Sequence, residues 1–270
     1  MGESAVAGTR KVLHHDEPVM GTVVTFDLYD DVLTSTDLAP LLDEAVHVLH
    51  EADDVFSTYK TDSPISRLRR GEITLGQCPS QVTEVLDLCR TARTLSDGWF
   101  DPWSVPEGVD PTGYVKGWAA QRSLDVFRVS ALRGALVNAA GDTASFGGPD
   151  AATPFRIGIV DPSDTQRLAC VVISPGAVAT SGVYERGMHL IDPRTRLPAS
   201  RSASATVTGP DLGLADALAT ALAVAGTPAL ALIEVIEEYE ALVIDHDGDF
   251  AMTSKFPMAQ TPPLARHSAG

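Results

Sequence analysis

The sequence predicts a single α+β domain in which mixed β-sheets pack with helices. Strand-like and helix-like segments alternate without the β–α–β rhythm of a parallel sheet, and no internal repeat or linker divides the 270 residues. A composition of 44% hydrophobic and 21% charged residues is typical of a globular protein with a sizeable core. We expect the domain to span residues 19–256, between an N-terminal extension (1–18) and a frayed C-terminal tail (257–270).

The first half of the chain is expected to hold one strand and three helices. Residues 22–29 alternate apolar and polar side chains, which is the pattern of a half-buried strand. Ser80 is the expected N-cap of the second helix, and Gly98 lies just beyond its end. The expected helices run over 37–55 and 80–95, with a shorter one that begins near Lys116 and Gly117.

The second half is expected to open with short strands and to end with a hairpin. The β-rich runs between Leu136 and Gly209 are ALVNAA, FRIGIVDP, LACVVIS, MHLID and ASATVTG. An apolar helix over 215–226 follows, and Thr227 and Pro228 are expected to open another helix as N-cap and first residue. The segments ALVID and DFAMTS are expected to pair as the closing hairpin.

The balance of charges excludes several classes of partner. A net charge of −16 argues against nucleic acid and against anionic membrane surfaces, and a phosphate ligand would need a local cation. No segment approaches 18 unbroken apolar residues, and the first residues lack the apolar core of a signal peptide. We therefore expect a cytoplasmic protein without membrane insertion. The three cysteines lack metal-ligand spacing and are expected to be buried free thiols.

One residue stands out in the apolar helix over 215–226. Asp216 lies inside it, and Thr220 follows four residues later, so the carboxylate and the hydroxyl share a helical face. Burying a carboxylate without compensation costs several kcal/mol or forces it to give up its charge. The residues alone leave two explanations, a hydrogen-bonded buried carboxylate and a metal ligand.

Other polar segments are candidates for sites or for turns. DHDGD (245–249) opens like a calcium loop, but the twelfth position lacks the required glutamate, so we expect a hairpin turn. NAAGDTASFGG (138–148) fits neither phosphate-loop spacing, which favours a structural turn. DPTGYVKG (110–117) leads into a helix start, whose amides favour anions. His189 and Asp192 flank a predicted strand end with a turn behind it.

Taken together, these segments resemble the ApbE family of flavin transferases, whose members are FAD:protein FMN transferases. The resemblance runs from Met20 to about Phe250, with eight motifs in the family's order. The chain departs from the family pattern at Trp99, where alanine is frequent, and at Ala140, which replaces the first glycine of a Gly-Gly-Asp stretch. The motifs are VMGT, FSTYKTDSPISRL, DGWFDPW, VDPTGYVKGWAAQR, NAAGD, ATSGVYER, HLIDPRT and ADALATAL.

The resemblance implies a Mg²⁺ site and a set of FAD contacts. Asp216 and Thr220 would supply side-chain oxygens and Gly113 a backbone carbonyl, which are the hard ligands that Mg²⁺ prefers beside substrate phosphates. Trp99 and Phe100 could equally be core aromatics. The implied FAD-binding residues are Met20, Tyr59, Trp99, Phe100, Asp101, Asp110, Lys116, Ser181 and Leu190.

The implied reaction is Mg²⁺-dependent transfer of FMN from FAD to a threonine hydroxyl of an acceptor flavoprotein, with release of AMP. The acceptor would carry the segment Asp-x-x-Ser/Thr-Gly/Ala-Ala/Ser-Thr, with FMN attached to the last threonine. His189, positioned by the turn at Asp192, is the candidate catalytic base. Two other functions stay open: a Mg²⁺-dependent FAD pyrophosphatase, which yields FMN and AMP, and a flavin-binding protein without catalysis.

Overall fold

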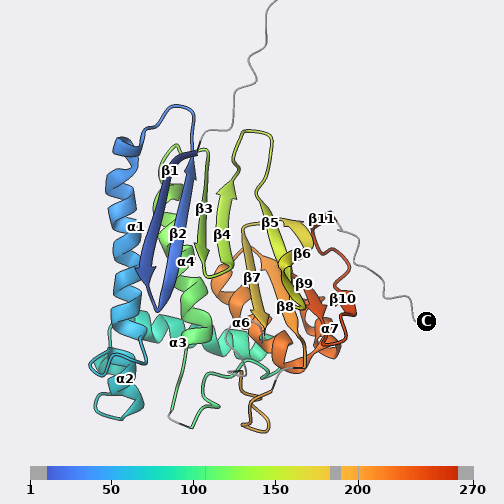
Figure 1. The fold of residues 1–270 in the computed structure, drawn as a ribbon. Helices are drawn as coiled ribbons and strands as arrows, with labels where there is room; N and C mark the ends of the chain where they lie inside the picture. Colours follow the sequence, from blue (N-terminus) through green and yellow to red (C-terminus); the bar gives the residue numbers. More distant parts are fainter. Residues whose placement is uncertain (1–10, 107, 183–189, 200, 261–270) are drawn as a thin grey trace, which may run out of the picture.

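The main feature of the fold is an antiparallel sheet covered by helices on one face (Figure 1). The computed structural model describes residues 11–106, 108–182, 190–199 and 201–260. Within these residues the large sheet has eight strands in the order β1-β2-β3-β4-β7-β8-β9-β10, and a second sheet has the order β11-β6-β5. The predicted α+β class is confirmed, and both sheets are antiparallel.

The strands of the large sheet come from both halves of the chain. They are β1 (Lys11–Val19), β2 (Thr22–Tyr29), β3 (Gly134–Ala139), β4 (Asp142–Gly147), β7 (Ala177–Gly182), β8 (Ser204–Gly209), β9 (Glu240–Ile244) and β10 (Phe250–Met252). The second sheet consists of β5 (Arg156–Asp161), β6 (Asp164–Ile173) and β11 (Met258–Gln260).

Four longer helices enclose the main core, and three of them contact the large sheet. They are α1 (Ser35–Phe56), α3 (Ser80–Leu95), α4 (Thr112–Arg128) and α6 (Leu212–Ala225). The shorter helices are α2 (Pro64–Arg69), α7 (Leu230–Ile233) and two 3₁₀ turns at Leu75–Gln77 and Thr227–Ala229. Along β7 the side chains alternate: Ala177 and Ala179 belong to the main core, whereas Val178 packs with the smaller sheet.

Several predicted elements agree with the structure. Alternate residues of β2 are fully buried, and α6 ends at Gly226, which has a φ of 80°. The closing hairpin forms from β9 and β10, and Asp245 accepts the amides of Asp247 and Asp249 in the turn between them. The three cysteines are free thiols; Cys89 and Cys170 are buried, and Cys78 is half-buried.

The predicted helix starts need correction. Ser80 is the first residue of α3 and makes no capping hydrogen bond, because Pro79 occupies the cap position. Helix α4 begins at Thr112 and not near Lys116 or Gly117, so Gly117 lies within it. Thr227 does not cap a helix; it is the first residue of a 3₁₀ turn capped by Gly226.

The predicted strands also need correction at four places. The extension over 1–18 contains most of β1, which pairs along β2, and residues 258–260 of the predicted tail pair with β6 as β11. Asp142–Gly147 forms strand β4 instead of continuing a turn. Residues 188 and 189 of the predicted strand MHLID lie outside the described residues, and the rest contributes only a bridge between Ile191 and Pro198.

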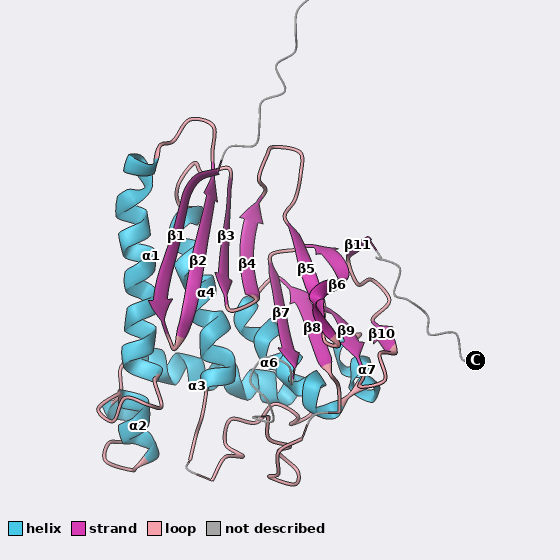
Figure 2. Cartoon of the chain, in the orientation of Figure 1, coloured by secondary structure: helices cyan, strands magenta, loops and turns pink. Residues whose placement is uncertain are grey.

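The antiparallel strand order brings two tight turns and the end of β7 to one end of the large sheet. Two-residue turns join β1 to β2 and β3 to β4, each with two residues of positive φ, as tight hairpins require. Strand β7 runs toward the same end and finishes there (Figure 2). The turns are Met20–Gly21 and Ala140–Gly141, and β7 finishes at Gly182.

Candidate functional site

The three predicted magnesium ligands come together where α4 crosses α6. Asp216 and Thr220 lie on α6, and the Asp216 side chain is buried. Gly113 lies in the first turn of α4, where a Cβ atom added to it would be 3.9 Å from the Thr220 hydroxyl oxygen and 3.3 Å from the Phe100 ring. The end of β7 adds Ser181, whose hydroxyl oxygen is 3.2 Å from that of Thr220.

Two glycines allow α4 and α6 to pack so closely that there is no room for a side chain between them. A Cβ atom on Gly117 would lie 2.4 Å from the carbonyl oxygen of Leu212, and one on Gly213 would lie 2.7 Å from the Tyr114 ring. Side chains larger than hydrogen would separate α4 from α6 at this point. Lys116 directly precedes Gly117, so the close crossing also brings its side chain to α6.

Lys116 connects two buried carboxylates. Its ammonium group forms an ion pair with Asp142 and lies 3.9 Å from a carboxylate oxygen of Asp216. Asp142 is 1% exposed, and its second oxygen accepts the amide of Thr180 at 2.8 Å. The carboxylates of β4 and α6 are thereby held on either side of one cation from α4.

The resemblance implies that Lys116 binds FAD, and in the structure Lys116 contacts the carboxylates of this crossing. Asp142 is a site residue that the sequence analysis missed. Its motif, NAAGD, was interpreted as a structural turn, and Ala140–Gly141 does form one. The available signal was an acidic residue directly after that turn, at the start of a buried strand.

The chemistry of this donor set fits Mg²⁺ better than a softer metal. Within the described residues no three histidine, cysteine or acidic side chains converge as a metal site. The crossing instead offers a carboxylate, two hydroxyls and the backbone of Gly113, whose helical carbonyl keeps a second lone pair. Sparse oxygen donors of this kind suit Mg²⁺, which takes few protein ligands and completes its shell with phosphate and water.

The loop before α4 holds two of the predicted FAD contacts, Asp101 and Asp110. The Asp101 carboxylate accepts the Trp103 amide at 3.0 Å and lies 3.0 Å from the Arg93 guanidinium. Asp110 accepts both the amide and the hydroxyl of Thr112, so it fixes the first turn of α4. The structure thus gives both carboxylates a local structural role beside the crossing.

Trp99 forms a cluster with two arginines from the segment after residue 189. The guanidinium carbon of Arg194 lies 3.7 Å from the centre of the Trp99 ring, and that of Arg201 lies 5.1 Å from it. The buried carboxylate of Asp192 accepts the Arg194 amide at 2.8 Å and lies 3.8 Å from the Arg201 guanidinium. Asp192 therefore fixes the turn that presents Arg194, and its carboxylate also lies beside Arg201.

The predicted base, His189, lies outside the described residues. Leu190, the next residue, is buried, and its carbonyl accepts the amide of Ala199. The segment that follows residue 189 is thus held by the backbone hydrogen bond from Ala199 to Leu190 and by the turn at Asp192.

Met20 and Tyr59 differ in their surroundings. Met20 packs against the core in the turn between β1 and β2. Tyr59 is 95% exposed on the loop between α1 and α2. The fold alone therefore does not pack its ring against the residues at the crossing of α4 and α6.

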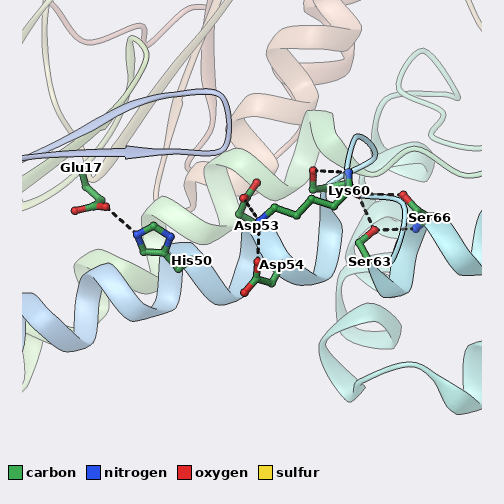
Figure 3. A network of polar contacts seen from close by, with 8 residues as sticks. Glu17, His50, Asp53, Asp54, Lys60, Ser63 and Ser66 are labelled. Carbon is green, nitrogen blue, oxygen red and sulfur yellow. Dashed lines mark hydrogen bonds and ion pairs between the residues drawn. The ribbon is translucent and has the colours of Figure 1, made fainter.

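The loop that carries Tyr59 is held by a polar network (Figure 3). The Lys60 ammonium group reaches back to α1, at 2.5 Å from Asp53 and 2.7 Å from Asp54. The hydroxyls of Ser63 and Ser66 both donate to the carbonyl of Ser57. These contacts fix the loop on both sides of the exposed ring.

Comparisons with known proteins agree with this architecture. The sequence profile of the ApbE family matches residues 20–108 and 106–243. A FAD:protein FMN transferase of Vibrio cholerae serotype O1 is 27% identical, over 88% of this chain and 89% of its own length. A second, from Rhodobacter capsulatus, is 35% identical over 127 residues, which is 44% of this chain and 24% of that protein.

Solved structures show the same fold. Flavin Transferase ApbE from Vibrio cholerae superposes with a TM-score of 0.77 at 24% identity, covering 90% of this chain and 97% of that one. The apo form of Pseudomonas stutzeri flavinyl transferase ApbE gives 0.76 at 25% identity, covering 90% and 95%. Among the described residues of this chain, none of the helices has the length and apolar character to cross a membrane.

Proposed function

The chain belongs to the ApbE family, and from this membership we propose that it is a FAD:protein FMN transferase. In the proposed reaction the hydroxyl of an acceptor threonine attacks the phosphorus of the FMN half of FAD. The bond from that phosphorus to the bridging oxygen breaks, AMP leaves with this oxygen, and the hydroxyl proton passes to a base.

The observation that carries the proposal is the meeting of Gly113, Ser181, Asp216 and Thr220 at the crossing of α4 and α6. Asp216, Thr220 and the Gly113 carbonyl would hold Mg²⁺. When bound, this ion supplies positive charge against the pyrophosphate, which phosphoryl transfer requires.

Other residues of the chain would position the reactants. Lys116, held between Asp142 and Asp216, gives a fixed cation near the reacting phosphates, and the Phe100 ring provides an apolar wall beside Gly113. Ser181 would hold the Thr220 hydroxyl in place. The further FAD contacts that we propose are Met20, Tyr59, Trp99, Asp101, Asp110 and Leu190.

We assign the role of base to His189. A neutral threonine hydroxyl is a poor nucleophile, and a histidine is suited to take its proton near neutral pH. The anchored turn at Asp192 lies three residues further along the chain. His189→Asn should keep FAD bound and slow transfer by about 10²–10⁴-fold.

The test is incubation of the protein with FAD, Mg²⁺ and an acceptor domain that carries the threonine segment. We expect an FMN adduct on the threonine by mass spectrometry, AMP in equal amount, and no reaction in EDTA. Asp216→Ala should abolish turnover, whereas Asp87→Ala, which removes an exposed carboxylate of α3, should not.

Two results would contradict the proposal. Rapid release of free FMN and AMP without an acceptor would make the protein a pyrophosphatase. Stable binding of FAD without turnover under any of these conditions would make it a flavin-binding protein.

A further inference from the structure

Arg194 and Arg201, which stack on Trp99, have no role in the proposed reaction. We call the two arginines and the tryptophan the arginine–tryptophan cluster. Trp99 is 9% exposed, while the side chains of Arg194 and Arg201 are 54% and 58% exposed. The tryptophan ring therefore lies beneath two guanidinium groups that face solvent, and stacking on the ring limits their orientations.

The arginines of the cluster lie on a segment that holds more basic than acidic residues. The chain as a whole has a net charge of −16, yet residues 193–210 contain three arginines and no acidic residue. Asp97 and Asp192 each lie beside one of the arginines, but the exposed guanidinium groups still favour an acidic partner at this place over the acidic remainder of the protein.

The guanidinium groups keep capacity for a further carboxylate. Arg194 lies 3.4 Å from one oxygen of Asp97, and Arg201 lies 3.8 Å from one oxygen of Asp192. Both contacts are longer than the roughly 2.7–2.9 Å of strong charge-assisted hydrogen bonds. Each guanidinium has five N–H donors, and more than half of each side chain is exposed.

The cluster borders the proposed active site. Trp99 is adjacent in sequence to Phe100, whose ring lies beside Gly113 and thus near Thr220. The loop before α4 and the segment after residue 189 lie together at the end of the sheet where α4 begins (Figure 1). A polypeptide that reaches the phosphates from solvent can therefore pass over the arginines.

We propose that the arginine–tryptophan cluster is the docking surface for the acceptor polypeptide, and that Arg194 and Arg201 bind a carboxylate of that polypeptide. This inference rests on the proposed transfer function. In the acceptor segment the aspartate precedes the modified threonine by six residues, which span at most about 20 Å when extended. The aspartate and the threonine of one extended acceptor segment can therefore contact two places on the protein that lie up to about this far apart.

Binding of a peptide tests the inference without any turnover. The probes are a short fluorescein-labelled peptide that carries Asp-x-x-Ser-Gly-Ala-Thr and the same peptide with asparagine in place of aspartate. We expect the wild-type protein, in fluorescence anisotropy without FAD, to bind the aspartate peptide about tenfold more tightly, with a preference that falls as salt rises. The double variant Arg194→Gln/Arg201→Gln should bind the two peptides equally.

Arg122→Gln is the matched control. Arg122 stacks over Trp118 at 4.9 Å and lies 3.0 Å from Glu84, with 47% of its side chain exposed, so it has the same chemistry away from the crossing. This variant should keep the preference for the aspartate peptide. If the double glutamine variant unfolds, Arg194→Lys/Arg201→Lys retains the charge but lacks the planar fork, and the preference should then fall only in part.

The transfer assay separates this inference from the function on which it rests. We expect the double variant to raise KM for the acceptor about tenfold and to leave KM for FAD within about twofold. Equal binding of both peptides by the wild type would overturn the inference, even if FMN transfer proceeds. A raised KM for FAD with an unchanged peptide preference would also overturn it, because the arginines would then serve the dinucleotide. Absence of FMN transfer with a clear peptide preference would refute the proposed reaction and support the docking surface.

Discussion

The assembly of the site depends on Gly117, so the substitution Gly117→Ala tests it directly. The added Cβ would lie 2.4 Å from the Leu212 carbonyl oxygen, 2.8 Å from its carbonyl carbon and 3.0 Å from the Gly213 Cα atom. All three are backbone atoms of the loop-to-helix start of α6, so no side-chain rotation relieves the overlap. The helices must move apart by about 1 Å to restore ordinary contact.

The expected cost combines two opposing effects. Forcing a methyl group into a packed interface costs about 1–3 kcal/mol, and contact with backbone favours the upper part of this range. Alanine is a better helix former than glycine by about 1 kcal/mol, which offsets part of the cost. We expect the free energy of unfolding to fall by about 1–2 kcal/mol. Lys116 directly precedes Gly117, so moving the helices apart should also lengthen the 3.9 Å contact between Lys116 and Asp216.

Thermal unfolding with and without Mg²⁺ measures both effects. For a chain of this size, 1 kcal/mol corresponds to about 2–4 °C in Tm, so a fall of about 2–8 °C is expected, with a smaller increase on adding Mg²⁺. Gly76→Ala is the control, since nothing lies within 4 Å of the added Cβ there. A Gly117→Ala protein that melts with the wild type and keeps its full response to Mg²⁺ would refute this account of the crossing.

Three side chains, those of Asp142, Glu17 and Cys89, give further predictions. Asp142→Asn removes the ion pair with Lys116, and we expect the free energy of unfolding to fall by about 1–3 kcal/mol in a denaturant titration. An unchanged free energy of unfolding would show that this ion pair does not stabilise the fold. The two histidines that contact Glu17 lower its pKa below the ordinary 4.5, so this stabilisation is present above pH 4.5 and is lost as the pH falls. Glu17→Gln should therefore lose less stability than the wild type between pH 7 and 4, and equal losses would refute the assignment. Burial raises the pKa of Cys89 to about 12, so this thiol should react with a disulfide reagent at pH 8 only after unfolding, and rapid labelling of the native protein would count against its burial.

The parts of the fold that sequence predicts are those set by local periodicity. Residues 22–29 alternate because one face is buried, and Gly226 ends α6 because it adopts a φ of 80°. The Asp216 and Thr220 pair was predictable for the same reason, since helical spacing alone places both on one face.

The start of α4 shows where local reasoning fails. The sequence around Gly113 and Gly117 has low helix propensity, so it predicts a helix start near Lys116 instead of at Thr112. Contact with α6 requires a glycine at position 117, because only a residue without a side chain fits against Leu212. Tertiary packing therefore overrides propensity at the residues that build the site.

Asp142 and the arginine–tryptophan cluster were missed because they depend on pairing across long separations. Asp142 acquires its role only when β4 pairs with β7 and α4 brings Lys116 across the sheet. The contact between Arg194 and Asp97 joins residues 97 positions apart. Neither arrangement has a signature in the local sequence, since a turn followed by an acid and three arginines in a loop are both common surface patterns.

The charges at the crossing give a physical reason for a divalent cation in the proposed reaction. Asp142 and Asp216 with Lys116 leave one negative charge, within a chain whose net charge is −16. A pyrophosphate that enters this field meets repulsion, which the lysine alone does not remove because its ammonium group is shared between two carboxylates. A divalent cation bound by Asp216 would make the local charge positive. Asp142 would then remain the partner of Lys116. The arginines around Trp99 lie at the edge of the site, where they act on a partner that arrives from solvent. We therefore infer that the chain uses separate cations for its two substrates, a metal beside Lys116 for the dinucleotide and Arg194 with Arg201 for the acceptor.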